Sequence, residues 1–170
     1  MYYSFRKDKS VGELGERIVV EDLLSCGFKF INDNKNNRYD IKMMNKDGKL
    51  LYFEVKTDVW CIPSKKIEAP FGVITIPPRD NGNMFIEVEC RGKPSGLLTT
   101  ISNYFVTYYP YYKEIWYISV DKLKKLINDN DFIKTEESGD VNSNTKGYLI
   151  NRFDYRDFFK IRITSHIWED

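Results

Sequence analysis

Two carboxylates and an amine occur close together in the sequence between Asp40 and Lys56. Asp40 precedes one apolar segment, and Glu54-Val55-Lys56 ends the next. Carboxylate oxygens are the ligands that Mg²⁺ prefers in proteins, and a neighbouring ammonium group can orient water or stabilise developing negative charge. A metal ion held in this way neutralises phosphate charge and produces hydroxide near neutral pH. The residue types therefore suit hydrolysis of a phosphodiester bond.

A Glu-x-Lys triplet also has a simpler interpretation. On a solvent-facing strand, alternating charges form an exposed ion pair that has no catalytic role. Taken alone, the triplet favours this simpler interpretation, so the placement of Asp40 relative to Glu54 has to decide between the two.

The turn between the two segments controls that placement. Asp47-Gly48 is a strong hairpin signal. A two-residue turn would put Asp40 and Glu54 on opposite faces of the hairpin. A three-residue loop over 46–48, with Gly48 left-handed, would set the two acids opposite each other. If the acids act together, the sequence predicts this loop or an equivalent bulge.

A helix is expected ahead of the hairpin, over Val11–Cys26, because its apolar residues recur with a helical period. Ser10 is the expected N-cap and Glu13 its capping-box partner. Glu16 lies in this helix next to Gly15, where the missing side chain would let another backbone approach closely.

Period-two patterns predict which faces of two strands are buried. In the second hairpin strand, Leu51, Phe53 and Val55 should pack on the core, while Glu54 and Lys56 line a cleft. A further strand over 84–90 places Phe85, Glu87 and Glu89 on one face. Glu87 is then either an extra acid for the cleft or part of a polar edge, and the sequence leaves both open.

The remaining segments give coarser signals. Strands are expected over 28–31, 72–76, 104–109, 114–120 and 148–151, and short helices over 97–103 and from an Asp121 cap to about Ile127. The stretch 134–147 has little to bury and is expected to be a mobile loop.

Length and composition indicate one soluble globular domain over residues 1–170, with 42% hydrophobic and 30% charged residues. The net charge is +1, so any nucleic-acid site must be a local patch rather than an overall basic excess. Candidate phosphate contacts near the acids are Lys35, Arg38, Arg91, Lys93 and Ser95. A solvated basic turn explains the last three equally well.

Cysteine and hydropathy patterns restrict the compartment. Cys26, Cys61 and Cys90 have no zinc-ligand spacing, and with a single histidine they indicate free thiols in a reducing compartment. The N-terminus has no apolar core, and no run of about twenty apolar residues occurs. The expected location is the cytoplasm, or the host cytoplasm if the source is viral, without a membrane partner.

The order of these features resembles the PD-(D/E)xK nuclease superfamily. The resemblance spans Gly12–Thr57 and consists of Gly-x-x-Gly-Glu on the first helix, a Gly-Phe at its end, Asp40, and Glu-Val-Lys. Within the superfamily it is similar to the archaeal Holliday junction resolvase type and to small phage-encoded nucleases. Tyr39 stands where the motif name has proline, and the chain after Thr57 matches the resolvase pattern poorly, which puts the substrate in doubt.

The resemblance implies an α/β (α+β) fold with an αβββαβ restriction-endonuclease-like core, in which helices flank a mixed central sheet. It implies Mg²⁺ or Mn²⁺ held by Asp40, Glu54 and the Val55 carbonyl. It also implies Lys56 as the catalytic lysine and Glu16 as the acid on the helix.

The first functional hypothesis is a metal-dependent endodeoxyribonuclease that acts on DNA, with branched DNA as one candidate substrate. Water would attack in line and leave a 5′-phosphate. Because resolvase-like enzymes need two active sites to cut two strands, a homodimer is one expected form. The alternative hypothesis is a nuclease-fold module that binds nucleic acid or a protein partner without cutting.

Overall fold

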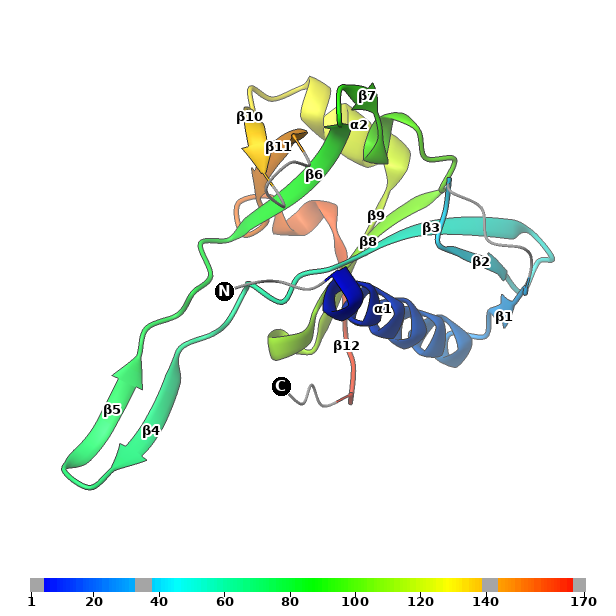
Figure 1. Cartoon of the computed structure of the whole chain (residues 1–170). Coiled ribbons are helices and arrows are strands. Elements are labelled where there is room, and N and C mark those ends of the chain that lie inside the picture. Colours follow the sequence, from blue (N-terminus) through cyan, green and yellow to red (C-terminus); the bar gives the residue numbers. More distant parts are fainter. Residues whose placement is uncertain (1–4, 33–37, 139–143, 167–170) are drawn as a thin grey trace.

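A six-stranded mixed sheet forms the centre of the fold (Figure 1). The computed structural model describes residues 5–32, 38–138 and 144–166. Strands β3 and β8 run parallel, whereas the other neighbouring pairs are antiparallel. In spatial order the strands are β1 (Lys29–Phe30), β2 (Ile41–Met44), β3 (Leu50–Thr57), β8 (Tyr104–Tyr109), β9 (Glu114–Ser119) and β12 (Lys160–Ile163).

Helix α1 (Phe5–Ser25) covers one face of this sheet. Its buried residues pack with the inward side chains of β2, β3, β8 and β9, among them Ile18, Phe53 and Val106. A Cβ built on Gly15 would lie 1.9 Å from Thr57 Oγ1, so a close approach does occur at this glycine, but it is made by the Thr57 side chain and not by a backbone as expected. Glycine at this position lets α1 rest directly on the end of β3.

The opposite face carries a second layer, a four-stranded sheet together with helix α2 (Val120–Asn128). Ile86, Trp116 and Leu123 are fully buried in the core between the layers. The second sheet has the order β10 (Ile133–Ser138), β11 (Thr145–Asn151), β6 (Asn83–Cys90) and β7 (Lys93–Pro94). Short 3-10 helices are η1 (Gly96–Leu98), η2 (Pro110–Tyr112) and η3 (Arg156–Phe158).

This arrangement is a mixed α+β fold, as the sequence predicted. The order of α1, β2, β3 and a parallel β8 follows the expected core. Between β3 and β8, however, the chain forms β4–β7 and η1 instead of a long helix. In the part of the chain that the structure describes, no helix combines the length and apolar character needed to cross a membrane.

Several local predictions need correction. Helix α1 begins at Phe5, so Ser10 lies inside it and is not its N-cap; the preceding residues are compatible with a helix and contain no Gly or Pro to stop it. Helix α2 is capped by Ser119, whose hydroxyl accepts from Lys122 N–H, and Asp121 sits in its first turn.

The predicted loop over 134–147 is wrong at both ends. Residues up to Ser138 belong to β10, and residues from Thr145 belong to β11, which pairs with it. Tertiary pairing overrides the polar composition here, because β11 is held on its other side by β6. Residues 139–143 lie outside the described part of the chain.

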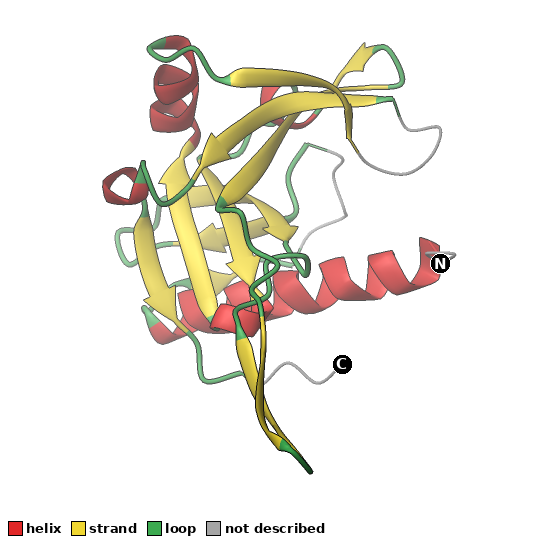
Figure 2. Cartoon of the chain, turned by 90° about the vertical axis from the view of Figure 1, so that its left-hand side faces the viewer, coloured by secondary structure: helices red, strands yellow, loops and turns green. Residues whose placement is uncertain are grey.

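A two-stranded arm, β4 (Lys65–Ala69) and β5 (Gly72–Ile76), extends away from the two layers (Figures 1 and 2). The sequence predicted β5 but not β4. The arm leaves the body shortly after β3 and returns to it just before β6.

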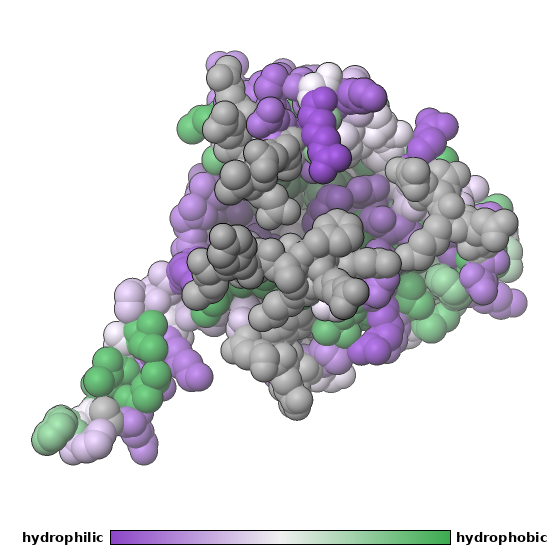
Figure 3. All heavy atoms as spheres, in the orientation of Figure 1, coloured by the Kyte–Doolittle hydropathy of each residue, from purple (hydrophilic) through white to green (hydrophobic). Residues whose placement is uncertain are grey.

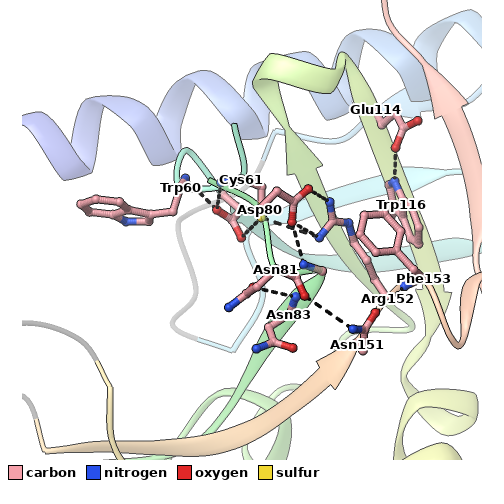
Figure 4. A network of polar contacts seen from close by, with 12 residues as sticks. Trp60, Cys61, Asp80, Asn81, Asn83, Glu114, Trp116, Asn151, Arg152 and Phe153 are labelled. Atoms are coloured by element: carbon pink, nitrogen blue, oxygen red, sulfur yellow. Dashed lines mark hydrogen bonds and ion pairs between the residues drawn. The ribbon is translucent and has the colours of Figure 1, made fainter. Parts of the chain in front are cut away.

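A buried ion pair closes the base of the arm (Figure 4). The side chains of Asp80 and Arg152 are 2% and 1% exposed, and Asp80 also accepts from Gly82 N–H at 2.8 Å. Burial raises the pKa of the Asp80 carboxyl, but the bonds from Arg152, Tyr112 and Gly82 outweigh it and hold that pKa below its ordinary value. The Arg152 guanidinium lies 4.4 Å from the centre of the Tyr109 ring, which completes its enclosure.

We predict that Asp80→Asn lowers the free energy of unfolding at pH 7 by about 3–5 kcal/mol, because it leaves the Arg152 charge buried and unpaired. A carboxyl whose pKa is lowered by folding stabilises the protein above its unfolded pKa, near 3.8, and loses that effect as the pH falls further. Denaturant unfolding should therefore show that this variant loses less free energy of unfolding than wild type between pH 7 and pH 3. The control, Asp154→Asn at an exposed position, should behave like wild type. The prediction would be contradicted if Asp80→Asn lost as much free energy of unfolding on acidification as wild type does.

Candidate active site

The β2–β3 hairpin has the three-residue loop that was predicted to set Asp40 and Glu54 opposite each other. Asn45 N–H donates to the Lys49 carbonyl at 2.9 Å, and Gly48 has a φ of +79°. The last paired residues of the ladder are Ile41 and Phe53, one step before the two acids. The predicted register is therefore confirmed up to Ile41 and Phe53, beyond which the Asp40 N–H bonds the Phe53 carbonyl.

The side chain of Asn45 stabilises this loop. Its Oδ1 accepts hydrogen bonds from the backbone N–H groups of Asp47, at 3.1 Å, and Lys49, at 2.8 Å. An asparagine that bonds the backbone two residues further on is a common turn former. This contact helps to select the longer loop over the two-residue turn that the Asp-Gly pair alone suggests.

Asp40 lies where β2 ends, and its side chain is directed at β3. Its backbone N–H donates to the Phe53 carbonyl at 3.0 Å, and Val55 N–H donates to its Oδ2 at 2.7 Å. The carboxylate thus takes the acceptor position that a main-chain carbonyl would occupy if β2 continued. Because the N–H and C=O of one strand residue point to the same edge, the Val55 carbonyl is also directed towards Asp40.

Glu54 and Lys56 lie on the predicted face of β3, opposite the buried Phe53 and Val55. Glu54 Oε1 is 3.1 Å from Lys56 Nζ, and the two side chains are 12% and 45% exposed. The pair therefore lies in a partly enclosed position, unlike the fully exposed pair of the simpler interpretation.

The Lys56 ammonium is paired with Glu54 and lies in the electrostatic field of two further acids. Desolvation lowers the pKa of Lys56, but the negative charges of Glu54, Asp40 and Glu87 together raise it above its ordinary value. Lys56 is consequently protonated at neutral pH. It can donate hydrogen bonds and carry positive charge, but it is not suited to be a general base there.

Glu87 comes to this site from β6 of the second sheet. Met84, Ile86 and Val88 are buried, and Glu87 lies on the other side of the strand, half-buried. The Ser95 hydroxyl donates to Glu87 Oε1 at 2.6 Å. Because Glu87 contributes to the pKa of Lys56, its carboxylate belongs to the same electrostatic environment.

Thr100 is a member of the site that the sequence did not reveal. Its hydroxyl lies 3.0 Å from the Arg38 carbonyl and 3.4 Å from Glu54 Oε2, and it accepts from Ser102 N–H at 3.1 Å. It therefore links Glu54 to the segment that leads into Asp40. No motif marks Thr100, since its position depends on how the chain folds after β7.

The other predicted site residues are placed as follows. Glu16 is half-buried on α1, next to the glycine that contacts the end of β3. Arg38 is exposed, and its Nε lies 3.5 Å from the Thr99 carbonyl. Arg91, with a φ of +52°, is exposed on the turn between β6 and β7, and Lys93 is exposed at the start of β7. Lys35 lies outside the described residues.

Asp40, Glu54 and the Val55 carbonyl form an all-oxygen donor set. Such hard ligands fit Mg²⁺ or Mn²⁺, and a carboxylate has enough acceptor positions to keep a backbone bond as well. Within the described ranges, no group of three or more His, Cys, Asp or Glu side chains is arranged to hold a metal. A metal at this site would therefore need the main-chain carbonyl or water in addition to the two acids.

No protein-family model and no curated protein matches this chain. Two solved structures resemble its fold. One is the bacterial homing endonuclease I-Ssp6803I, with 12% identity, a TM-score of 0.41 and coverage of 78% of this chain and 82% of that one. The other is the tetrameric restriction endonuclease SfiI bound to cognate DNA, with 15% identity, a TM-score of 0.41 and coverage of 97% and 74%. With TM-scores this low, neither likeness assigns an activity to this chain.

We predict that Glu54→Gln lowers the pKa of Lys56, because Glu54 is the largest of the influences that raise it. The Lys56 Cε resonance, followed by NMR through a pH titration, measures this directly. The control is Glu89→Gln, since Glu89 pairs with Lys146 at 2.8 Å instead. An unchanged or higher Lys56 pKa in Glu54→Gln would contradict the arrangement described.

Proposed function

We propose that this chain is a divalent-metal-dependent endodeoxyribonuclease that hydrolyses phosphodiester bonds at Asp40, Glu54 and Lys56. The observation that carries the proposal is the hairpin register, which brings both acids to one lysine. The simpler interpretation, a solvent-exposed ion pair, explains neither the nearby Asp40 nor the low exposure of the Glu54 side chain, which is 12%.

Under this proposal, Asp40, Glu54 and the Val55 carbonyl hold Mg²⁺ or Mn²⁺. The bound ion would neutralise phosphate charge and lower the pKa of water. The Val55 N–H fixes the direction of the Asp40 carboxylate, and Thr100 contacts Glu54, so both acids are orientated before substrate binds.

Lys56 acts in the proposal as a charged donor. Its ammonium orients the attacking water or stabilises negative charge that develops on the phosphate. Glu54 both shares in metal binding and keeps Lys56 protonated. A lysine with a raised pKa holds its proton, so the water proton is transferred elsewhere, to a phosphate oxygen or to solvent.

The remaining residues have supporting roles. Glu16 and Glu87 add carboxylates that can accept hydrogen bonds from water near the site. Ser95, whose hydroxyl is bonded to Glu87, positions that acid instead of contacting phosphate. Arg38 and the exposed turn with Arg91 and Lys93 are the proposed contacts to the DNA backbone, together with Lys35.

DNA is the proposed substrate. Branched junctions are the first DNA structures to test, because the pattern from Gly12 to Thr57 is similar to that of junction resolvases. Linear duplex and single strands complete the panel of substrates.

We predict that Lys56→Ala reduces cleavage at least about 100-fold, since it removes a preorganised charge from the transition state. The assay incubates the full chain with Mg²⁺ and labelled branched, duplex and single-stranded DNA. The variant should keep most of its DNA binding, because the proposed backbone contacts are intact.

The matched control is Lys49→Ala, which removes an exposed lysine just before the start of β3. It should cleave like wild type. Retained cleavage in Lys56→Ala would refute the assignment of the site. Binding without cleavage by the wild-type chain, with every substrate and with both metals, would favour the non-catalytic module instead.

A further inference from the structure

The β4–β5 arm has one apolar face and one polar face. Cross-strand partners share a face in an antiparallel pair, so Ile67 and Ile74 lie together, with Ile76 next to them. These three side chains are 40%, 57% and 44% exposed. The opposite face carries the pairs Lys66–Thr75 and Glu68–Val73. The isoleucine face, defined by Ile67, Ile74 and Ile76, is thus turned to solvent.

Two large aromatic side chains are also exposed near the ends of the arm. Phe71 at the tip of the arm is 102% exposed, and Trp60 near its base is 53% exposed. Figure 3 shows apolar side chains gathered along the arm, well apart from the body. Among the residues that the structure describes, none covers this surface.

A ribbon of two strands is only marginally stable in water unless it packs against something. An exposed apolar strand pair with open edges also invites uncontrolled association. A long arm with an apolar face is therefore expected to bind a specific partner that covers this face.

The chemistry of the isoleucine face selects the partner. The isoleucine face itself carries no charge, and the nearest charged residue on the same side of the arm is Lys65, which is paired with Ile76 at the base. A ribbon that lies in a nucleic-acid groove needs cations and amide side chains along its length to contact phosphates and base edges. A flat face of isoleucines instead complements a second face of the same kind, which a two-fold axis supplies.

The area also suits a second copy of this chain. A fully exposed phenylalanine presents roughly 200 Å² of surface. Together with Trp60 and the isoleucine face, each arm offers on the order of 500 Å² of exposed surface, so two paired arms would bury the ~1,000 Å² in total that a specific interface needs.

We infer that the β4–β5 arm is a dimerisation element, in which the isoleucine face of one arm packs on the same face of a second copy. The arm joins β3, which carries Glu54 and Lys56, to β6, which carries Glu87. Pairing of two arms therefore fixes two candidate sites relative to each other. The inference itself stands without the proposed nuclease activity.

Sedimentation of the full chain over a concentration series tests this, with Ile74→Lys as the disrupting variant and Val73→Lys as its matched control. Both replace an exposed aliphatic residue on β5 by lysine, but on opposite faces, and in Val73→Lys the new ammonium is placed opposite Glu68. Wild type should be dimeric at micromolar concentration. Ile74→Lys should weaken the dimer at least about 30-fold, since it buries a charge in the apolar contact, whereas Val73→Lys should change it less than about 3-fold.

A wild-type chain that stays monomeric throughout the series would overturn the inference, as would equal weakening by both variants. If wild type is monomeric and Ile74→Lys alters retention on DNA, the arm contacts nucleic acid instead. Because the readout is mass, an inactive but dimeric protein would leave this inference intact while the proposed function failed. Circular dichroism of each variant confirms that the body is folded.

Discussion

The register of the β2–β3 hairpin is the constraint on which the candidate site depends. A slip of one residue would turn every side chain of one strand to the other face and separate Asp40 from Glu54. Two features oppose that slip: the bonds of Asn45 across a loop closed by a left-handed Gly48, and the Val55 N–H that binds Asp40. The geometry of a short surface loop thus decides whether two acids meet.

The layers around the central sheet determine how costly it is to place charged groups on it. Helix α1 covers one face, and the second sheet and α2 cover the other, so both faces are largely apolar. Glu54 and Lys56 lie on the second face, beside the neighbouring strand whose Phe105 enters that core. Lys56 keeps 45% of its side chain exposed, which limits the cost of desolvating its charge.

Local signals allowed the sequence to predict the hairpin loop and the alternating faces of β3 and β6. They also marked Gly15 as a point of close approach, although the approaching group is the Thr57 side chain. Those features depend on turn chemistry and on period-two patterns within a few residues. Thr100 and β10 could not be predicted in this way, because each depends on contacts with distant parts of the chain. The helix caps failed for a related reason: Ser10 and Asp121 have suitable side chains, but the helices begin further upstream.

Together, the hairpin, the second sheet and the arm form one account: the hairpin carries Asp40 and Glu54, β6 carries Glu87, and the arm between β3 and β6 pairs two copies. Its central claim is that Asp40 and Glu54 bind one divalent ion. Anomalous diffraction from crystals soaked in Mn²⁺ tests this most directly. The account predicts a peak in contact with both carboxylates and the Val55 carbonyl, and its loss in Asp40→Asn. A peak elsewhere, or none at these residues in the wild-type protein, would contradict it.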